Sequence, residues 1–246
     1  MPRRRIWLIL AVVASILAGL LHQPLLSAVT RCYRSSDAID ESSITHLYLL
    51  DGDRLLETAI AMASDGKPIL IPQEATLRSV QCGAAPSPDE VKPQLLLELG
   101  AAPGQTELVP GAAWDDYQRI EYLGQWMDQN PDAVVCMLAE ALASGRLRRI
   151  VDRKFTDQAA SRLKIKPLDP IDHSADRWWR STTGCKEFYG QSIAWLYDWI
   201  SPNGTPRPDD MSPQEYEDAF RQRLRSLGVR LSDAPPQPEL SPQGAS

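Results

Sequence analysis

Ala133-Val134-Val135-Cys136-Met137-Leu138 is the most apolar of the short runs that predict β-strands in this chain. Six apolar residues without a polar interruption are typical of a strand that is buried on both faces, as happens in a parallel sheet covered by helices. The run therefore predicts the central strand of an α/β domain, and the neighbouring segments fit that interpretation.

Shorter apolar runs on either side predict further strands, and amphipathic segments of helical length separate them. The predicted strands are 46–50, 68–72, 107–109 and 163–165, and the predicted helices are 54–64, 89–99, 114–129 and 144–155. This alternation is typical of β-α units around a parallel sheet. We therefore expect an α/β fold: a Rossmann-like, doubly wound, mostly parallel sheet of about five strands with helices on both faces, plus an N-terminal transmembrane helix.

The N-terminus carries the expected transmembrane helix. Arg3-Arg4-Arg5 leads into an unbroken apolar stretch from Ile6 to Leu21. The arginines are expected to stay on the cytoplasmic face of the inner membrane, which sends the rest of the chain to the periplasm or another extracytoplasmic space. The stretch reaches only about 24 Å as a helix, so residues 24–29 would have to complete the span. A cleaved signal peptide, with a mature chain starting near Val29, is the alternative, but Leu26 and Ala28 fit a small-residue cleavage site poorly.

Composition divides the chain into five parts. We expect a membrane anchor at 1–30, a polar neck at 31–43, the α/β domain at 44–200, a helical extension at 201–231 and a disordered tail at 232–246, which is rich in proline and small polar residues. The net charge is −6 and the basic residues beyond the first five are scattered among acids, so nucleic acid is not an expected partner.

The segment from Trp178 to Ile200 is rich in aromatic residues. They recur on what is expected to be one broad face of a helix. Packing of this helix on the sheet is the favoured interpretation, because Asp198 and the lack of flanking basic residues argue against the alternative, a helix lying on the bilayer surface.

The four cysteines, Cys32, Cys82, Cys136 and Cys185, are too widely spaced for a zinc or redox C-x-x-C motif. Cys136 is expected to be a buried apolar residue. A bridge between Cys82 and Cys185 is conceivable, and the connectivity stays open.

Polar residues gather where the predicted strands end. Ligands of doubly wound sheets bind outside the carboxyl ends of the strands. The candidate ligand-binding residues at these ends are Asp51, Gly52, Arg54, Glu74, Asp115 and Arg146. Gly52 would let a ligand approach the backbone, the two arginines could grip a phosphate or carboxylate, and the three acids could serve as acid, base or metal ligand.

Each of these residues also has a purely structural explanation. Asp51 or Asp53 and Ser144 could cap helices, and Asp115 and Asp116 could complement a helix dipole. Two arginines near helix starts are not explained by capping, which favours a ligand site. No metal site, cofactor or catalytic residue is identified. With only His22, His46 and His173, a histidine-dependent site is hard to build.

Several short motifs follow one another in an order that a known family shares. The first motif is an apolar strand that ends in glycine and is followed by arginine; here it is Leu49-Leu50-Asp51-Gly52-Asp53-Arg54. The second motif follows a later strand and runs from Ala139 to Arg146. The pair Trp178-Trp179 and then Gly184 close the pattern. Together with the N-terminal stretch, this order resembles the YdcF/SanA/ElyC family of bacterial envelope proteins over residues 44–200.

The chain departs from that family at specific positions. In the family's Thr-Ser-x-x-His-x-x-Arg pattern, Arg146 is kept, but the threonine is Ala139 and the histidine is Ala143. The Ser/Thr-Gly-Gly loop is replaced by residues 72–75, and a further threonine is replaced around Trp114-Asp115. The resemblance implies a Rossmann-like domain facing away from the cytoplasm, a role in envelope biogenesis or barrier maintenance, and an anionic or nucleotide-like ligand. The replaced positions argue against shared chemistry.

Three functions follow as hypotheses. The leading one is a membrane-anchored envelope protein that binds an anionic small molecule or lipid-linked precursor through Arg54 and Arg146. The second is a hydrolase or transferase that uses Asp51, Glu74 or Asp115. The third is a non-catalytic envelope scaffold whose aromatic C-terminal section contacts a partner.

Overall fold

A five-stranded, all-parallel sheet forms the centre of the computed structural model, which describes residues 22–50, 53–76, 80 and 84–200, with residues 53 and 54 described only by their backbone. The strand order is β3-β2-β1-β4-β5. The strands are β1 (His46–Leu49), β2 (Ile69–Glu74), β3 (Thr106–Ala113), β4 (Val135–Glu140) and β5 (Leu163–Leu168). The predicted α/β fold with a parallel sheet of about five strands is confirmed.

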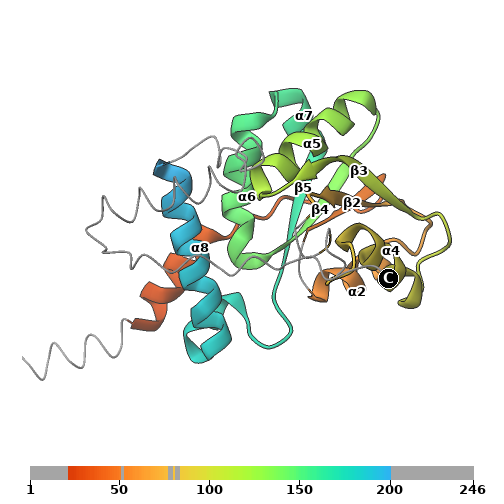
Figure 1. Cartoon of the computed structure of the whole chain (residues 1–246). Coiled ribbons are helices and arrows are strands. Elements are labelled where there is room, and N and C mark those ends of the chain that lie inside the picture. The colour runs from red at the N-terminus through yellow and green to blue at the C-terminus, as the bar shows by residue number, and fades with distance from the viewer. Residues whose placement is uncertain (1–21, 51–52, 77–79, 81–83, 201–246) are drawn as a thin grey trace, which may run out of the picture. The chain divides into compact units, whose positions relative to one another are not determined.

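Helices cover both faces of the sheet (Figure 1). On one face lie α5 (Asp116–Gln129), α6 (Ala141–Lys154) and α7 (Asp157–Arg162), and on the other lie α2 (Asp53–Met62) and α4 (Pro88–Glu98). Successive side chains of a strand point to opposite faces of the sheet, so neighbouring residues belong to different hydrophobic cores. In β1, Tyr48 joins the core under α5 and α6, whereas Leu47 and Leu49 join the core under α2 and α4.

The apolar run around Cys136 is internal but is not the central strand. β1 occupies the middle, and β4 lies between β1 and β5. The expectation was wrong because both strands are buried on both faces, and an unbroken apolar run does not reveal which of two such strands is the middle one. Cys136 is fully buried as expected, and burial raises the pKa of its thiol to about 12.

α6 begins three residues earlier than predicted. Its first residue is Ala141 rather than Ser144, and the N-cap, Glu140, makes no capping bond with its side chain. The sequence therefore holds no local cap signal at the true start. Ser144 instead donates its hydroxyl to the Ala141 carbonyl and accepts a hydrogen bond from the Ser35 backbone. As a result Arg146 lies in the second turn of α6.

The expected neck runs along the domain. The Asp37 carboxylate accepts a hydrogen bond from the Ile165 backbone at 2.7 Å and contacts Arg148, and Ile39 packs against the core under α2. Residues 34–43 therefore belong structurally to the α/β unit.

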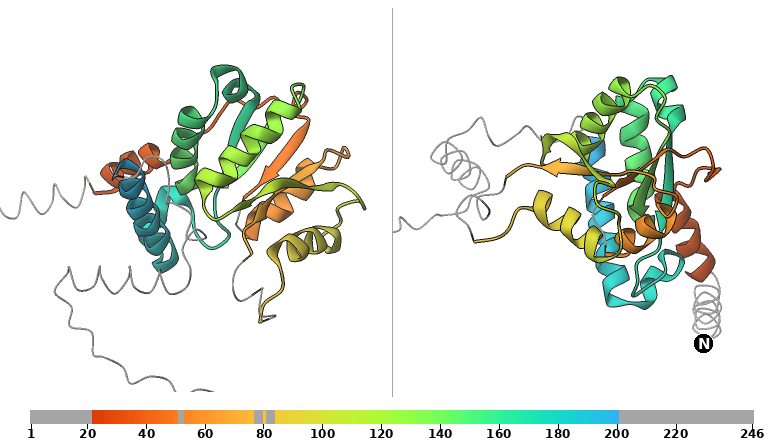
Figure 2. Two further views of the ribbon diagram at one scale, coloured as in Figure 1. Left: turned by 45° about the horizontal axis from the view of Figure 1, so that its top comes forward. Right: turned by 90° about the vertical axis from the view of Figure 1, so that its right-hand side faces the viewer.

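The aromatic section after the sheet forms a short 3₁₀ helix, η1 (Ala175–Arg180), and then α8 (Thr182–Ile200). The principal neighbours of α8 are η1 and α6, so the expectation that it packs on the sheet is wrong. A helix over residues 22–33 lies beside α8 (Figure 1 and the left panel of Figure 2). The Tyr33 and Ser192 hydroxyls are 2.9 Å apart and hydrogen-bonded across the two helices.

Within the described ranges, no helix is long and apolar enough to cross a membrane. The apolar stretch 6–21, the extension 201–231 and the tail 232–246 lie outside those ranges. Residues 22–30, the end of the expected anchor, are helical, and Leu26 packs against a cluster that includes Leu142 and Trp178.

Candidate ligand-binding site

The structure describes the side chains of three of the six candidate residues. Asp51 and Gly52 lie outside the described residues, and Arg54 is present only as backbone in the first turn of α2. Glu74 ends β2, Asp115 precedes α5, and Arg146 lies in α6. These three lie at the carboxyl edge of the sheet as predicted, but all three are engaged within the protein.

Asp115 is a helix cap. Its backbone is extended, and its carboxylate accepts a hydrogen bond from the Gln118 backbone at 2.9 Å. This contact satisfies one of the free N–H groups at the start of α5. Asp115 was expected only to complement the helix dipole, and the structure shows that it is the N-cap of α5.

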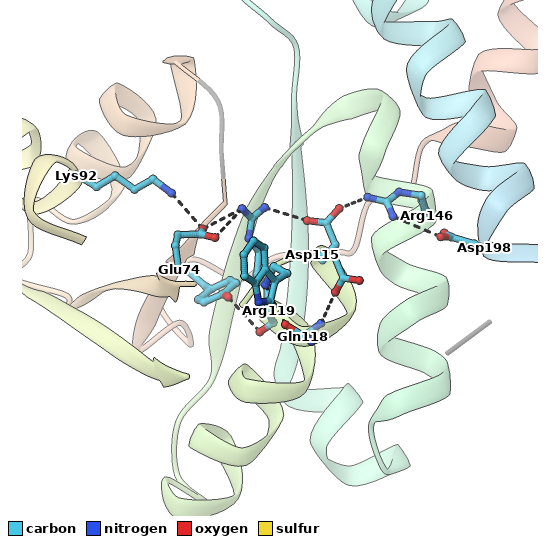
Figure 3. A network of polar contacts seen from close by, with 10 residues as sticks. Glu74, Lys92, Asp115, Gln118, Arg119, Arg146 and Asp198 are labelled. Carbon is cyan, nitrogen blue, oxygen red and sulfur yellow. Dashed lines mark hydrogen bonds and ion pairs between the residues drawn. The ribbon is translucent and has the colours of Figure 1, made fainter. Parts of the chain in front are cut away.

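Glu74 and Arg146 belong to a chain of alternating charges (Figure 3). Glu74 pairs with Arg119 at 2.9 Å and with Lys92 at 3.5 Å. Arg119 also pairs with Asp116 at 3.1 Å. Asp116 contacts Arg146, which lies 3.6 Å from Asp198 on α8. The chain of three cations and three anions therefore connects α4, β2, α5, α6 and α8 along the sheet edge.

Arg146 is largely enclosed by this network. Its side chain is 12% exposed, and both of its terminal nitrogens face carboxylates. An anionic ligand would have to displace Asp116 or Asp198 to reach the guanidinium, and a carboxylate left buried without its partner is costly. A small cavity of about 150 Å³ beside Asp116 and Arg119 is below the size of ordinary ligand pockets. The geometry favours a structural role for Arg146, and its predicted role in binding a ligand stays a prediction.

A larger cavity, of about 550 Å³, opens on the other side of the Glu140 end of β4. Its lining includes Leu55 from the first turn of α2, the segment 168–173 after β5, and Thr183, Lys186 and Glu187 from α8. The sheet order reverses direction between β1 and β4, and doubly wound proteins bind ligands at the carboxyl edge of such a switch point. In position and size this cavity is the best candidate site.

His173 is the most constrained polar residue of the cavity. Its side chain is 3% exposed, with Nδ1 2.9 Å from an Asp172 oxygen and Nε2 2.8 Å from a Glu187 oxygen. The backbone of Gly184 packs so closely that an added Cβ would lie 2.8 Å from the His173 ring and 2.4 Å from the Trp178 carbonyl. The imidazole is therefore fixed between two carboxylates, one at each ring nitrogen.

The two carboxylates flanking His173 differ in environment. Hydrogen bonds from His173 and Thr183 lower the pKa of Asp172 below its usual value. Burial raises the pKa of Glu187, and the nearby His173 opposes that rise. Glu187 also has one buried oxygen without a hydrogen-bond partner. A histidine between an exposed and a buried acid can relay a proton.

His173, Glu187 and Lys186 were not predicted as site residues, and the small number of histidines argued against a histidine-dependent site. His173 follows the end of β5 by five residues, so the rule that ligands bind after strand ends would have included it if applied to the last strand. Glu187 lies 14 positions further along, on a separate helix, and no local spacing connects the two.

The described side chains do not suggest a metal centre. No group of three or more histidine, cysteine or acidic residues among them is arranged to hold a metal ion. Cys32, Cys136 and Cys185 are free, and Cys82 lies outside the described residues, so the conceivable Cys82 to Cys185 bridge receives no support.

Comparison with known proteins gives no match: no family model, curated protein or solved structure is similar to this chain at a significant level. The site must therefore be interpreted from its own residues.

Proposed function

We propose that the protein is a membrane-anchored, extracytoplasmic, YdcF-like envelope protein that binds a small polar molecule in the cavity between β4, β5, α2 and α8. The observation that carries this proposal is the cavity of about 550 Å³ at the β1/β4 switch point, which has the volume of a small-molecule site and the position that α/β folds use for ligands. The order of the sequence motifs and the arginine-flanked apolar stretch support the envelope assignment.

The lining indicates the chemistry of the ligand. Four acids line the cavity, Glu140, Asp169, Asp172 and Glu187, and carboxylate oxygens accept hydrogen bonds from hydroxyl or amino groups. Asp169 already accepts hydrogen bonds from Ser174 and Ala175. Lys186 and the first turn of α2, whose N-terminal end carries a partial positive charge, attract an anionic group. A sugar phosphate carries both hydroxyl groups and an anionic group, either as a free molecule or as the headgroup of a lipid-linked precursor. The anion is thus assigned to Lys186 and the start of α2 rather than to Arg146.

The test uses the full chain purified in detergent and thermal-shift measurements with hexose phosphates, the matching free hexoses and inorganic phosphate. Hexose phosphates should raise the Tm more than free hexoses or inorganic phosphate, because only they contact the acids through hydroxyl groups and Lys186 through the phosphate. Glu187→Gln and Lys186→Met should each reduce that rise. Lys154→Met, which removes a lysine of α6 that does not line the cavity, should not. If no compound raises the Tm, or if all the variants respond as the wild type does, the cavity is not the binding site.

The enclosed His173 favours a hydrolase or transferase as a second candidate function. The imidazole could act as general acid or base, with Asp172 fixing its orientation. Phosphorus NMR of hexose phosphate incubated with the full chain would show inorganic phosphate released by the wild type. His173→Gln should abolish release while the thermal shift persists. Binding without turnover by the wild type would exclude this hydrolytic activity and leave the binding function standing.

A further inference from the structure

α8 exposes a continuous apolar face. Tyr189, Ile193, Leu196 and Ile200 recur at helical spacing, and their exposed fractions are 63%, 70%, 51% and 71%. Trp199, 76% exposed, and Tyr197, 44% exposed, flank this line. These six residues are called the α8 apolar face below. Asp198 is the only charged residue between Tyr189 and Ile200. Soluble proteins rarely leave so large a continuous apolar surface uncovered.

The rotation of α8 about its own axis is fixed by contacts on its opposite side. The Phe188 ring stacks on Trp178 with centroids 3.7 Å apart, and Ser192 meets Tyr33. Asp198 is buried and points to Arg146, as Figure 3 shows. Phe188, Ser192 and Asp198 thus contact the rest of the protein, and the α8 apolar face points outward.

The helix over residues 22–33 connects α8 to the N-terminal apolar stretch. Leu26 and Tyr33 pack against the same cluster as Phe188, and the Tyr33 and Phe188 ring centroids are 5.0 Å apart. Figures 1 and 2 show this helix beside α8. Residues 22–30 of this helix are also the end of the expected membrane anchor.

We propose that the α8 apolar face lies on the extracytoplasmic surface of the lipid bilayer. This inference rests on the proposed membrane anchoring. Residues 24–29 are expected to complete the membrane span, and the helix that contains them packs on α8, so the anchor holds α8 at the level of the lipid headgroups. Tryptophan and tyrosine flanking an aliphatic line are typical of helices in that interface. The occupant is therefore lipid rather than a soluble partner.

The same placement brings the candidate cavity close to the headgroups. Lys186 and Glu187 line the cavity from the first half of α8, and the apolar face begins two residues later at Tyr189. A ligand attached to a lipid could then enter the cavity without leaving the membrane, which agrees with a lipid-linked sugar phosphate as the ligand.

Photo-crosslinking of the full chain in its native membrane tests the contact. A benzoylphenylalanine residue is placed at Ile193, and in a matched control at Leu97, an exposed leucine of α4 with 45% exposure. Mass spectrometry after irradiation should find lipid adducts at position 193 and few or none at position 97. Adducts joining position 193 to residues 1–21, to residues 201–246, to a second copy or to another protein would each overturn the proposal, as would equal lipid labelling at both positions.

Alkaline carbonate extraction of the same membranes separates the two possible failures. If carbonate releases the chain, the membrane anchor itself is wrong and the α8 proposal falls with it. If the chain stays in the membrane while position 193 acquires no lipid, the anchor stands and only the α8 proposal is overturned.

Discussion

Arg146 illustrates how burial changes the meaning of a charged residue. The sequence suggested a solvent-facing arginine in the first turn of a helix, whereas the structure places it in the second turn, 12% exposed and between Asp116 and Asp198. Removing one member of a buried ion pair leaves a carboxylate without its partner, and this costs more than the pair itself contributes.

Arg146→Ala should therefore lower the free energy of unfolding by about 3 kcal/mol, measured by urea denaturation of the full chain. Lys154→Ala is the matched control, because Lys154 lies on the same helix as Arg146 and pairs with the more exposed Glu121 of α5. Its loss should cost less than about 1 kcal/mol. Equal losses in the two variants would show that Arg146 contributes no more than a surface charge.

The buried carboxyl of Glu187 should make the stability of the protein depend on pH. Burial raises its pKa in the folded state above the unfolded value of about 4.5. The folded state then binds the proton more tightly, so this group costs stability as the pH rises through the unfolded pKa and up to the raised one. Glu187→Gln removes that cost while keeping an oxygen near His173.

The variant should have a higher Tm than the wild type at about pH 7, and this advantage should shrink at about pH 4, where the wild-type carboxyl is protonated in both states. Thermal unfolding of both proteins at the two pH values measures it. Glu121→Gln, at a half-exposed carboxylate, should show little difference at either pH. A Tm difference that does not change with pH would mean that burial of the charge is not what limits stability here.

At the scale of helices and strands, the contact between α6 and the N-terminal segment depends on Gly145. A Cβ built on Gly145 would lie 2.5 Å from the Tyr33 carbonyl oxygen and 2.8 Å from its carbon. These are backbone atoms, so they cannot rotate away as a side chain would. Gly145→Ala should destabilise the domain by about 2 kcal/mol, because the segment must move away from α6.

Gly190 provides the control for this prediction. It lies in α8, and a Cβ added there would meet nothing within 4 Å. Gly190→Ala should stabilise the protein by about 0.5 kcal/mol, because alanine loses less entropy on forming a helix. Thermal unfolding of both variants measures the opposite signs. If Gly145→Ala does not lower the stability, the helix over residues 22–33 does not pack against α6.

The positions of the strands could be predicted because buried strands appear in the sequence as short apolar runs. All five were located from sequence, although β3 extends to Ala113, well beyond the predicted 107–109. The strand continues through Pro110, which cannot donate to the ladder but is tolerated because β3 is an edge strand of the described sheet. α7 was missed because six residues are too few to show a helical period.

The candidate site was predictable in position but not in composition. The strand-end rule selected the correct edge of the sheet, yet Asp115 and Glu74 were already engaged in a cap and in ion pairs. His173 and Glu187 meet only because the chain after β5 turns back over the sheet edge into α8. That approach depends on tertiary packing around Trp178, which no local pattern in the sequence reports.

At the scale of the whole molecule, the N-terminal segment and α8 act as one structural unit. Thr30 donates to the Leu26 carbonyl and lies 3.4 Å from the Ala175 carbonyl, so the helix over residues 22–33 is fixed to η1 as well as to α8. An anchor attached to a loose linker would leave the domain free to tumble. If the proposed anchor precedes this packed helix, the domain has a fixed orientation to the membrane, with the α8 apolar face toward the lipid as proposed.

The proposed function also places the domain outside the cytoplasm. Because Arg3-Arg4-Arg5 precedes the apolar stretch, the positive-inside rule assigns the N-terminus to the cytoplasm and the rest of the chain to the opposite side. A reporter enzyme that works only outside the cytoplasm should therefore be active when fused after Ser232, and a reporter that works only inside should be silent there. Replacing the three arginines with glutamate should reduce the first signal, since the charge that fixes the topology is gone. Activity of the cytoplasmic reporter on the wild-type chain would refute the topology, whereas a mature chain starting near Val29 would show cleavage and remove the anchor that holds α8 at the bilayer.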